Sequence, residues 1–204
     1  MMILIPRMLN YSQLDLFGIL GLVKKISGTD LRPNIIDSPL SFWLPSIFGV
    51  GLRKIEISKD FALLVNGVAV KLHGVNHHDT SKYRGWCQTD EELRRDLLLM
   101  KELNINCVRT AHYPPTPEFL NMCDELGFYV ILETDIECHG FLRRNANVNY
   151  AFDVDDEIWP ATNPIWQKEH VERMQRAALL NINHVSIIMW STGNESGHGP
   201  NHVA

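Results

Sequence analysis

The feature that most constrains the fold is a regular alternation of apolar, strand-like runs with amphipathic segments from residue 70 to the C-terminus. Three of these amphipathic segments repeat their apolar residues at helical spacing. Strands and helices that alternate in this way form a parallel sheet covered by helices, so the pattern predicts an α/β fold. The four runs that we interpret as buried strands span residues 70–75, 105–109, 128–132 and 185–190.

Local signals mark the ends of two helices. Thr89 as N-cap and Glu92 three positions later form a capping box. Thr116 followed by Pro117 opens the next helix, and Gly127 closes it. We expect apolar stripes on three helices, made of Leu93, Leu97, Met100 and Leu103; of Phe119, Cys123 and Leu126; and of Val171, Met174 and Ala178.

Two α/β architectures use this alternation. A dinucleotide-binding sheet places a GxGxxG turn after its first strand, and no such turn follows residue 75. A (β/α)8 barrel needs no such turn and typically takes about 250 residues. Residues 71–204 make up about half of that length, so we favour the first half of a (β/α)8 TIM barrel, with about four βα units.

The residues before the barrel segment fall into two parts. Residues 1–51 show no sustained periodicity and are interrupted by prolines, so we leave them unassigned and irregular. Residues 52–70 contain strand-like runs on both sides of Asn66-Gly67, a dipeptide that favours the tight turn of a β-hairpin. We therefore expect a short β-hairpin at 52–70 and a partial barrel at 71–204.

Polar, titratable residues follow every predicted strand. The carboxyl ends of barrel strands share one face, and the active sites of barrel enzymes lie there. We therefore expect a functional site on this face. Its candidate residues are Asn76, His77, His78 and Asp79 after the first strand; Arg109, His112 and Tyr113 after the second; Glu133, Asp135, Glu137 and His139 after the third; and Asn194, Glu195 and His198 after the fourth.

Glu195 is the strongest catalytic candidate on this face. It follows a strand that is almost entirely apolar, and burial raises the pKa of a carboxyl group so that it keeps its proton near neutral pH. Glycoside hydrolysis uses such an acid together with a second carboxyl group. The alternative is that Glu195 caps a loop amide.

Other residues at the strand ends have two interpretations each. Glu137 and His139 lie one residue apart, which points both side chains the same way in an extended segment. Facing Glu195, they could hold Mg²⁺ or Mn²⁺, or they could simply form hydrogen bonds. His78 and His112 could donate hydrogen bonds to sugar hydroxyls or be structural histidines.

Three further side chains enter the site prediction. Trp86 and Trp159 lie in loops, where each could stack on a sugar face or fill a hydrophobic gap. Arg109, at a strand end, more often orients a carboxylate than contacts substrate.

The net charge and the cysteine content limit which binding partners and which cellular compartment we expect for this protein. The net charge of −5 gives no basic surface for nucleic acid, and no apolar run is long enough to span a membrane. Neither metal-finger spacing nor a signal peptide is present. Three of the cysteines lie in or next to apolar segments, which is typical of buried free thiols in a reducing compartment, so we expect a cytoplasmic protein. The cysteines are Cys87, Cys107, Cys123 and Cys138.

Four motifs, in order and in spacing, resemble the β-galactosidases of glycoside hydrolase family 2. They are HGVNHHD at 73–79, VRTAHYP at 108–114, ETDIECHGF at 133–141 and IIMWSTGNESGHG at 187–199. The resemblance covers residues 52–204, and its ECHG and GNESGHG forms look more like β-galactosidases than β-glucuronidases or β-mannosidases. It implies a TIM barrel that hydrolyses terminal non-reducing β-D-galactose residues in β-galactosides. It also implies that residues 52–70 end a β-sandwich domain.

The resemblance implies a catalytic carboxyl group and a metal. Glu195 corresponds to the general acid/base. Together with Glu137 and His139, it corresponds to the ligand set of an active-site Mg²⁺.

It also implies roles in substrate binding. His78 and His112 correspond to histidines that contact the galactosyl unit, and Asn194 to the asparagine that binds the sugar 2-hydroxyl. Arg109 resembles the buried structural arginine of the family.

The family's nucleophile is a second glutamate on a later barrel strand, and no residue of this chain matches it. A retaining mechanism needs two carboxyl groups about 5 Å apart, so we expect the isolated chain to be inactive, although its family is that of an enzyme acting on small-molecule β-galactosides. The alternative function is a non-catalytic fragment that binds sugar or metal or complements another chain. Open sheet edges favour a homo-oligomer, a complementing chain or poor solubility.

Overall fold

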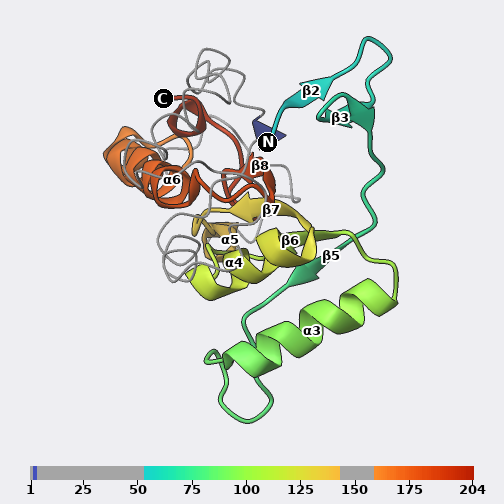
Figure 1. The fold of residues 1–204 in the computed structure, drawn as a ribbon. Coiled ribbons are helices and arrows are strands. Elements are labelled where there is room, and N and C mark those ends of the chain that lie inside the picture. Colours follow the sequence, from blue (N-terminus) through green and yellow to red (C-terminus); the bar gives the residue numbers. More distant parts are fainter. Residues whose placement is uncertain (1, 4–52, 143–158) are drawn as a thin grey trace, which may run out of the picture. The chain divides into compact units, whose positions relative to one another are not determined.

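The computed structural model describes residues 2–3, 53–142 and 159–204 (Figure 1). All of them belong to one compact unit, which comprises residues 1–4 and 51–204. The expectation that residues 1–51 are irregular falls outside the described residues, except at Met2 and Ile3.

Four parallel strands form the sheet at the centre of this unit. They are β5 (Gly74–His77), β6 (Cys107–Thr110), β7 (Tyr129–Glu133) and β8 (Ile187–Ser191). Each pairs with the next strand in chain order, and β1 (Met2–Ile3) adds an antiparallel pair to β8. A doubly wound sheet would reverse its strand order, whereas a barrel keeps its strands in sequence. The prediction of a partial barrel is therefore confirmed.

Each strand begins further along the chain than the sequence predicts, and the first differs most. β5 begins at Gly74 rather than at residue 70. The side chain of Asn106 explains the difference, because its Oδ1 accepts the His73 N–H at 2.8 Å and its Nδ2 donates to the Lys71 carbonyl at 3.0 Å. The Asn106 side chain thus takes the place of a strand partner at the Lys71 carbonyl and the His73 N–H, and the first backbone bonds to the next strand segment are those that the His73 carbonyl accepts from Asn106 and Cys107.

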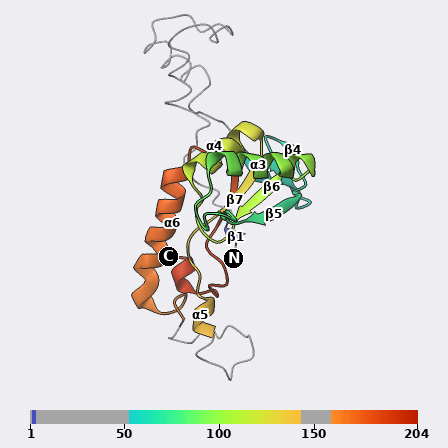
Figure 2. The ribbon, with the colours of Figure 1, turned by 90° about the horizontal axis from the view of Figure 1, so that it is seen from below.

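Three long helices alternate with the strands along the chain and pack on the sheet (Figure 2). They are α3 (Asp90–Glu102), α4 (Pro117–Leu126) and α6 (Gln167–Asn181). Short helical segments occur at α5 (His139–Leu142), η3 (Pro164–Trp166) and η4 (Pro200–His202). The capping box of Thr89 and Glu92 is present, as is the cap at Thr116. Gly127 ends α4 with a φ of 70°.

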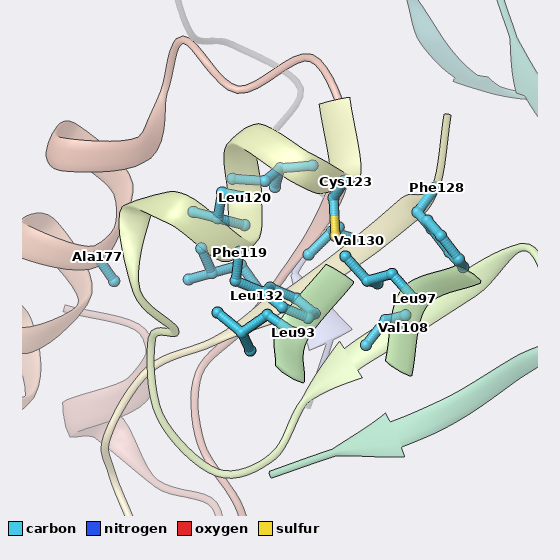
Figure 3. Packing of buried hydrophobic residues seen from close by; sticks show 11 residues of the cluster. Leu93, Leu97, Val108, Phe119, Leu120, Cys123, Phe128, Val130, Leu132 and Ala177 are labelled. Carbon is cyan, nitrogen blue, oxygen red and sulfur yellow. The ribbon is translucent and has the colours of Figure 1, made fainter. Parts of the chain in front are cut away.

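The main core lies between the sheet and these helices (Figure 3). Of the ten predicted stripe residues, four are buried in it, namely Leu93, Leu97, Phe119 and Cys123, and Met100 and Leu126 pack against it partly buried. Leu103 is exposed because it lies just beyond α3, which ends at Glu102. Val171 and Met174 are only half-buried. The core residues are Leu93, Leu97, Val108, Phe119, Leu120, Cys123, Phe128, Val130, Leu132, Ala177 and Ile187.

A small antiparallel sheet precedes the barrel strands. It consists of β2 (Ile55–Ile57), β3 (Leu63–Val65) and β4 (Val68–Ala69). Asn66 and Gly67 connect β3 to β4 with φ values of 51° and 80°, the left-handed values that a type I′ turn requires. The assignment of this sheet to the end of a β-sandwich domain, and the other domain boundaries, stay predictions. No helix in the described ranges is long and apolar enough to cross a membrane.

Candidate active site

A buried ion pair joins the carboxyl ends of β6 and β7. Arg109 Nε donates to Glu133 Oε2 and Arg109 Nη2 donates to Glu133 Oε1, both at 2.7 Å. The Glu133 carboxylate is fully buried, and Ser191 Oγ on β8 donates to it at 2.7 Å. Burying a carboxylate is costly unless it is paired and hydrogen-bonded, and these partners meet both needs. Glu133 is thus a structural centre of the site.

Arg109 also orients the amide that precedes the catalytic candidate. Its Nη2 donates to Asn194 Oδ1 at 2.9 Å, and Asn194 Nδ2 donates to Glu137 Oε2 at 2.7 Å. A guanidinium only donates and a carboxylate only accepts, so these two partners fix which way the Asn194 amide points. A chain of contacts therefore runs from Glu133 through Arg109 and Asn194 to Glu137.

His112 lies against the same buried carboxylate. Its Nδ1 is 2.8 Å from Glu133 Oε1, and Arg109 Nη2 lies 3.2 Å from the same nitrogen. Because a carboxylate accepts, Nδ1 carries the hydrogen and the guanidinium contact is not a hydrogen bond. The ring of His78 meets that of His112 edge-on, with centroids 5.2 Å apart. The structure thus brings both predicted sugar-binding histidines together.

His77 does not belong to this site. It lies within β5 instead of following it, and its ring stacks on Phe119 of α4 at 4.7 Å between centroids. Burial lowers the pKa of His77. Because successive strand residues face opposite sides of a sheet, His77 points to the helices.

Glu195 lies in the turn after β8. Its side chain is 51% exposed to solvent, so the prediction that this carboxyl group is buried is wrong. The reason is that β8 ends at Ser191, four residues earlier. Glu195 has a φ of 41°, an uncommon value for a residue with a side chain, and such strain often marks functional sites.

Close packing against the end of β7 shapes this turn. A Cβ on Gly193 would meet the Ile136 carbonyl oxygen at 2.4 Å, so only glycine fits there. The Asn194 N–H donates to the same carbonyl at 2.9 Å, and Asn194 pairs with Glu137 in a parallel bridge. This pairing brings the ends of two strands, with their polar side chains, together.

Two of the three predicted metal ligands are in contact. His139 Nδ1 lies against Glu195 Oε2, although the contact lacks hydrogen-bond geometry and this buried nitrogen has no hydrogen-bond partner. Two carboxylates and an imidazole are donors that a divalent cation accepts. However, no three His, Cys, Asp or Glu side chains gather closely enough to hold an ion within the described ranges. Glu137 instead accepts hydrogen bonds from Asn194 and from the His139 N–H.

Several contacts near the site could not be predicted from the sequence. Asp135 pairs with Arg173 of α6. Ser196, next to Glu195, lies 3.1 Å from His202 Nε2, and the His202 ring meets that of His170 edge-on at 5.0 Å. These pairs join distant segments, and their local patterns carry no signal for them.

The two loop tryptophans differ. Trp159 is buried with Ile136 and Cys138 in a second apolar cluster, which supports its interpretation as a residue that fills a hydrophobic gap. Trp86 is 76% exposed and stacks on Tyr113.

Comparison with known proteins identifies the family. Residues 55–204 match the TIM barrel domain of the glycosyl hydrolases family 2. The β-galactosidase of Arthrobacter sp. (strain B7) is 44% identical over 173 residues, and that of Photobacterium profundum is 40% identical over 171 residues. Both matches cover 84% of this chain, and they cover 16% and 15% of the two relatives.

Solved structures of related enzymes share the fold. The β-glucuronidase of Ruminococcus gnavus aligns with a TM-score of 0.60 and 28% identity, covering 71% of this chain and 23% of that chain. The Bifidobacterium dentium β-glucuronidase complexed with coumarin-3-O-glucuronide aligns with a TM-score of 0.57 and 27% identity, covering 71% of this chain and 20% of that chain.

The chain spans about one sixth of the length of the curated relatives it matches. The family match covers most of the chain, and the strands follow one another in barrel order. The protein therefore belongs to the glycosyl hydrolases family 2 and carries part of its TIM barrel domain.

Proposed function

We propose that this protein carries the part of a β-galactosidase active site that holds the general acid/base. The complete site hydrolyses terminal non-reducing β-D-galactose residues with retention. The observation that carries the proposal is the contact chain Glu133–Arg109–Asn194–Glu137, which orients polar groups beside Glu195 at the strand ends. Galactose as the sugar is supported by the curated relatives, which are β-galactosidases.

Glu195 acts as the general acid/base in this proposal. It protonates the departing glycosidic oxygen and later takes a proton from water. Its half-exposed position leaves the carboxyl group accessible to a leaving group. Asn194, oriented by Arg109, binds the sugar 2-hydroxyl.

The two histidines bind the galactosyl unit. Because His112 Nδ1 donates to Glu133, its Nε2 in the neutral form accepts a hydrogen bond from a sugar hydroxyl. This differs from the donor role that the sequence suggested. His78, exposed beside it, is free to donate to a neighbouring hydroxyl.

Mg²⁺ is part of the proposal, with Glu137, His139 and Glu195 as its ligands. The contact between His139 and Glu195 and the buried, unbonded Nδ1 of His139 support it. When bound, the ion would supply positive charge beside the acid/base. Each oxygen of the Glu137 carboxylate accepts one hydrogen bond, from Asn194 or from the His139 N–H, and keeps a second lone pair with which it would ligate the ion.

The isolated 204-residue chain is proposed to be inactive. Among the described residues, the three carboxyl groups at the carboxyl end of β7 are already bonded: Glu133 to Arg109 and Ser191, Asp135 to Arg173, and Glu137 to Asn194 and the His139 N–H. None is therefore available as the nucleophile that retention needs. A chain-complementing or sugar-binding module is the alternative, and a complementing chain is the partner that could supply the nucleophile.

The state of the cysteines supports the proposal that the protein resides in a reducing compartment, the cytoplasm. Cys107, Cys123 and Cys138 are buried and free, and burial raises the pKa of Cys107 and of Cys138 to about 11. Such thiols are inert, as expected where disulfides do not form.

Two measurements on the purified chain test the proposal. The first is turnover of a nitrophenyl β-galactoside with Mg²⁺, beside Glu195→Gln; we expect none in either. Turnover by the parent chain that is lost in Glu195→Gln would support the role of Glu195 as acid/base but contradict the proposed inactivity.

The second measurement is NMR titration with methyl β-D-galactoside and its glucose epimer. We expect the galactoside alone to shift the His78 and His112 signals, and equal shifts with both sugars would refute galactose specificity.

A further inference from the structure

The loop that joins β5 to α3 is held by its own hydrogen bonds. Ser81 and Gly85 exchange N–H···O bonds of 2.6 and 3.0 Å, and Gly85 has the positive φ of 65° that the turn needs. Glu92, in the first turn of α3, accepts from Ser81 Oγ at 2.9 Å and from Arg84 Nη1 at 3.0 Å. The loop therefore holds the next residue, Trp86, in a defined position.

Trp86 has one face covered and one face open. Its indole stacks on the ring of Tyr113 with centroids 5.6 Å apart and planes 20° apart. The Tyr113 hydroxyl accepts the Asp79 N–H at 3.1 Å, which fixes the phenol beneath the indole. Trp86 is nevertheless 76% exposed. A large aromatic surface on an ordered loop is left in water, which disfavours folding but favours binding.

The stacked pair lies on the face that carries the active site. Trp86 follows β5 and Tyr113 follows β6, so both come from loops at the carboxyl ends of the strands. The ring of Tyr113 is 6.1 Å from that of His78, and His78 is 5.2 Å from His112. A continuous row of rings therefore leads from the proposed galactosyl position to Trp86.

We propose that the open face of Trp86 is the subsite for the leaving-group sugar, a second pyranose linked to the galactosyl unit. This rests on the proposed function, which places the galactosyl unit beside His78 and His112. A pyranose presents a face of C–H groups that packs on an indole, while its hydroxyls stay in water. Trp86 thus favours disaccharides over galactosides with small leaving groups.

The test compares two ligands on the full chain. Lactose carries the second pyranose, and methyl β-D-galactoside does not. Affinities are measured by NMR titration, with the Trp86 indole N–H and the His78 and His112 rings as reporters. The variants are Trp86→Ala, which removes the platform, Trp86→Phe, which keeps an aromatic face, and Trp166→Ala, a control at an exposed tryptophan in η3.

We expect lactose to shift the Trp86 signal and the methyl galactoside to leave it in place. Trp86→Ala should weaken lactose binding about tenfold, as truncating a contact aromatic does, while methyl galactoside affinity stays unchanged. Trp86→Phe should restore most of the lactose affinity, and Trp166→Ala should change neither ligand.

Two outcomes would overturn the subsite. If both ligands shift the histidines but lactose affinity is equal in the parent chain and Trp86→Ala, the subsite is wrong and the proposed galactoside binding stands. If neither ligand shifts any reporter, galactoside binding by this chain fails together with the subsite.

Discussion

Two Arg–Glu pairs among the described residues are bidentate but have opposite surroundings. Arg109 and Glu133 meet at the strand ends with the carboxylate fully buried. Arg94 and Glu125 join α3 to α4 on the surface, with N···O distances of 3.0 and 2.8 Å. Water screens the surface pair and competes for its hydrogen bonds, whereas a broken buried pair leaves a charge with no compensation. Geometry alone therefore does not rank the two pairs.

Replacing Glu133 with Gln should destabilise the chain strongly. The change leaves the Arg109 guanidinium without its counter-charge and replaces one of two accepting oxygens with an NH2 donor, which must face Arg109 or Ser191 Oγ, so we expect a loss of about 3 kcal/mol in the free energy of unfolding. Urea denaturation followed by tryptophan fluorescence measures this loss. Arg94→Ala is the matched control, and its urea midpoint should hardly move. Equal effects of the two variants would show that burial does not distinguish the pairs.

At the scale of elements, the signals that predicted the structure are local. Thr89, Thr116 and Gly127 cap their helices as expected, because a cap depends on residues within one turn of the chain. The alternation of strands and helices predicts a parallel sheet, the absence of a GxGxxG turn favours the barrel order that the strands show, and the motifs at the strand ends predict the candidate site.

The features that the sequence did not predict depend on contacts between segments that are distant in the chain. The beginning of β5 depends on the side chain of Asn106, which is more than thirty residues away. The His77 ring stacks on Phe119 of α4, and the turn that carries Glu195 packs closely against Ile136 at Gly193. Periodicity within a window carries no information on such contacts.

The junction of α6 and η4 gives the protein an acid-sensitive element. His202 of η4 bonds to Ser196 and packs against the buried His170 of α6. Desolvation by burial, with a smaller contribution from the neighbouring His170, lowers the pKa of His202 from 6.5 to about 4. His202 is therefore neutral in the folded chain at pH values where the unfolded chain takes up a proton.

The stability contributed by this junction should fall as the pH drops from about 6.5 towards about 4, because only the unfolded chain binds the proton across that window. His202→Gln removes the titrating group and should flatten the acid side of the stability profile. Urea midpoints between pH about 7 and about 4.5 measure it. His73→Gln, at an exposed histidine, is the control, and a profile unchanged by His202→Gln would contradict this origin.

At the scale of the whole molecule, the described sheet is open. The outer edge of β5 has no strand partner among the described residues. Helices α3 and α6 also carry leucines that are exposed although they lie next to core positions. Both features favour association between molecules. The exposed leucines are Leu98 and Leu99 of α3, Leu103 just beyond it, and Leu179 and Leu180 of α6.

We expect the purified chain to associate as its concentration rises, and the adjacent Leu179 and Leu180 on α6 to contribute most, since they are the most exposed of the five. The double variant Leu179→Gln/Leu180→Gln should shift sedimentation-velocity profiles towards the monomer. Val203→Gln, at a single exposed apolar residue beyond η4, is the matched control and should leave association unchanged. Association that persists in the double variant would point instead to strand pairing at β5, because that edge bonds through the backbone and tolerates changes on α6. A chain that stays monomeric at every concentration would contradict both routes.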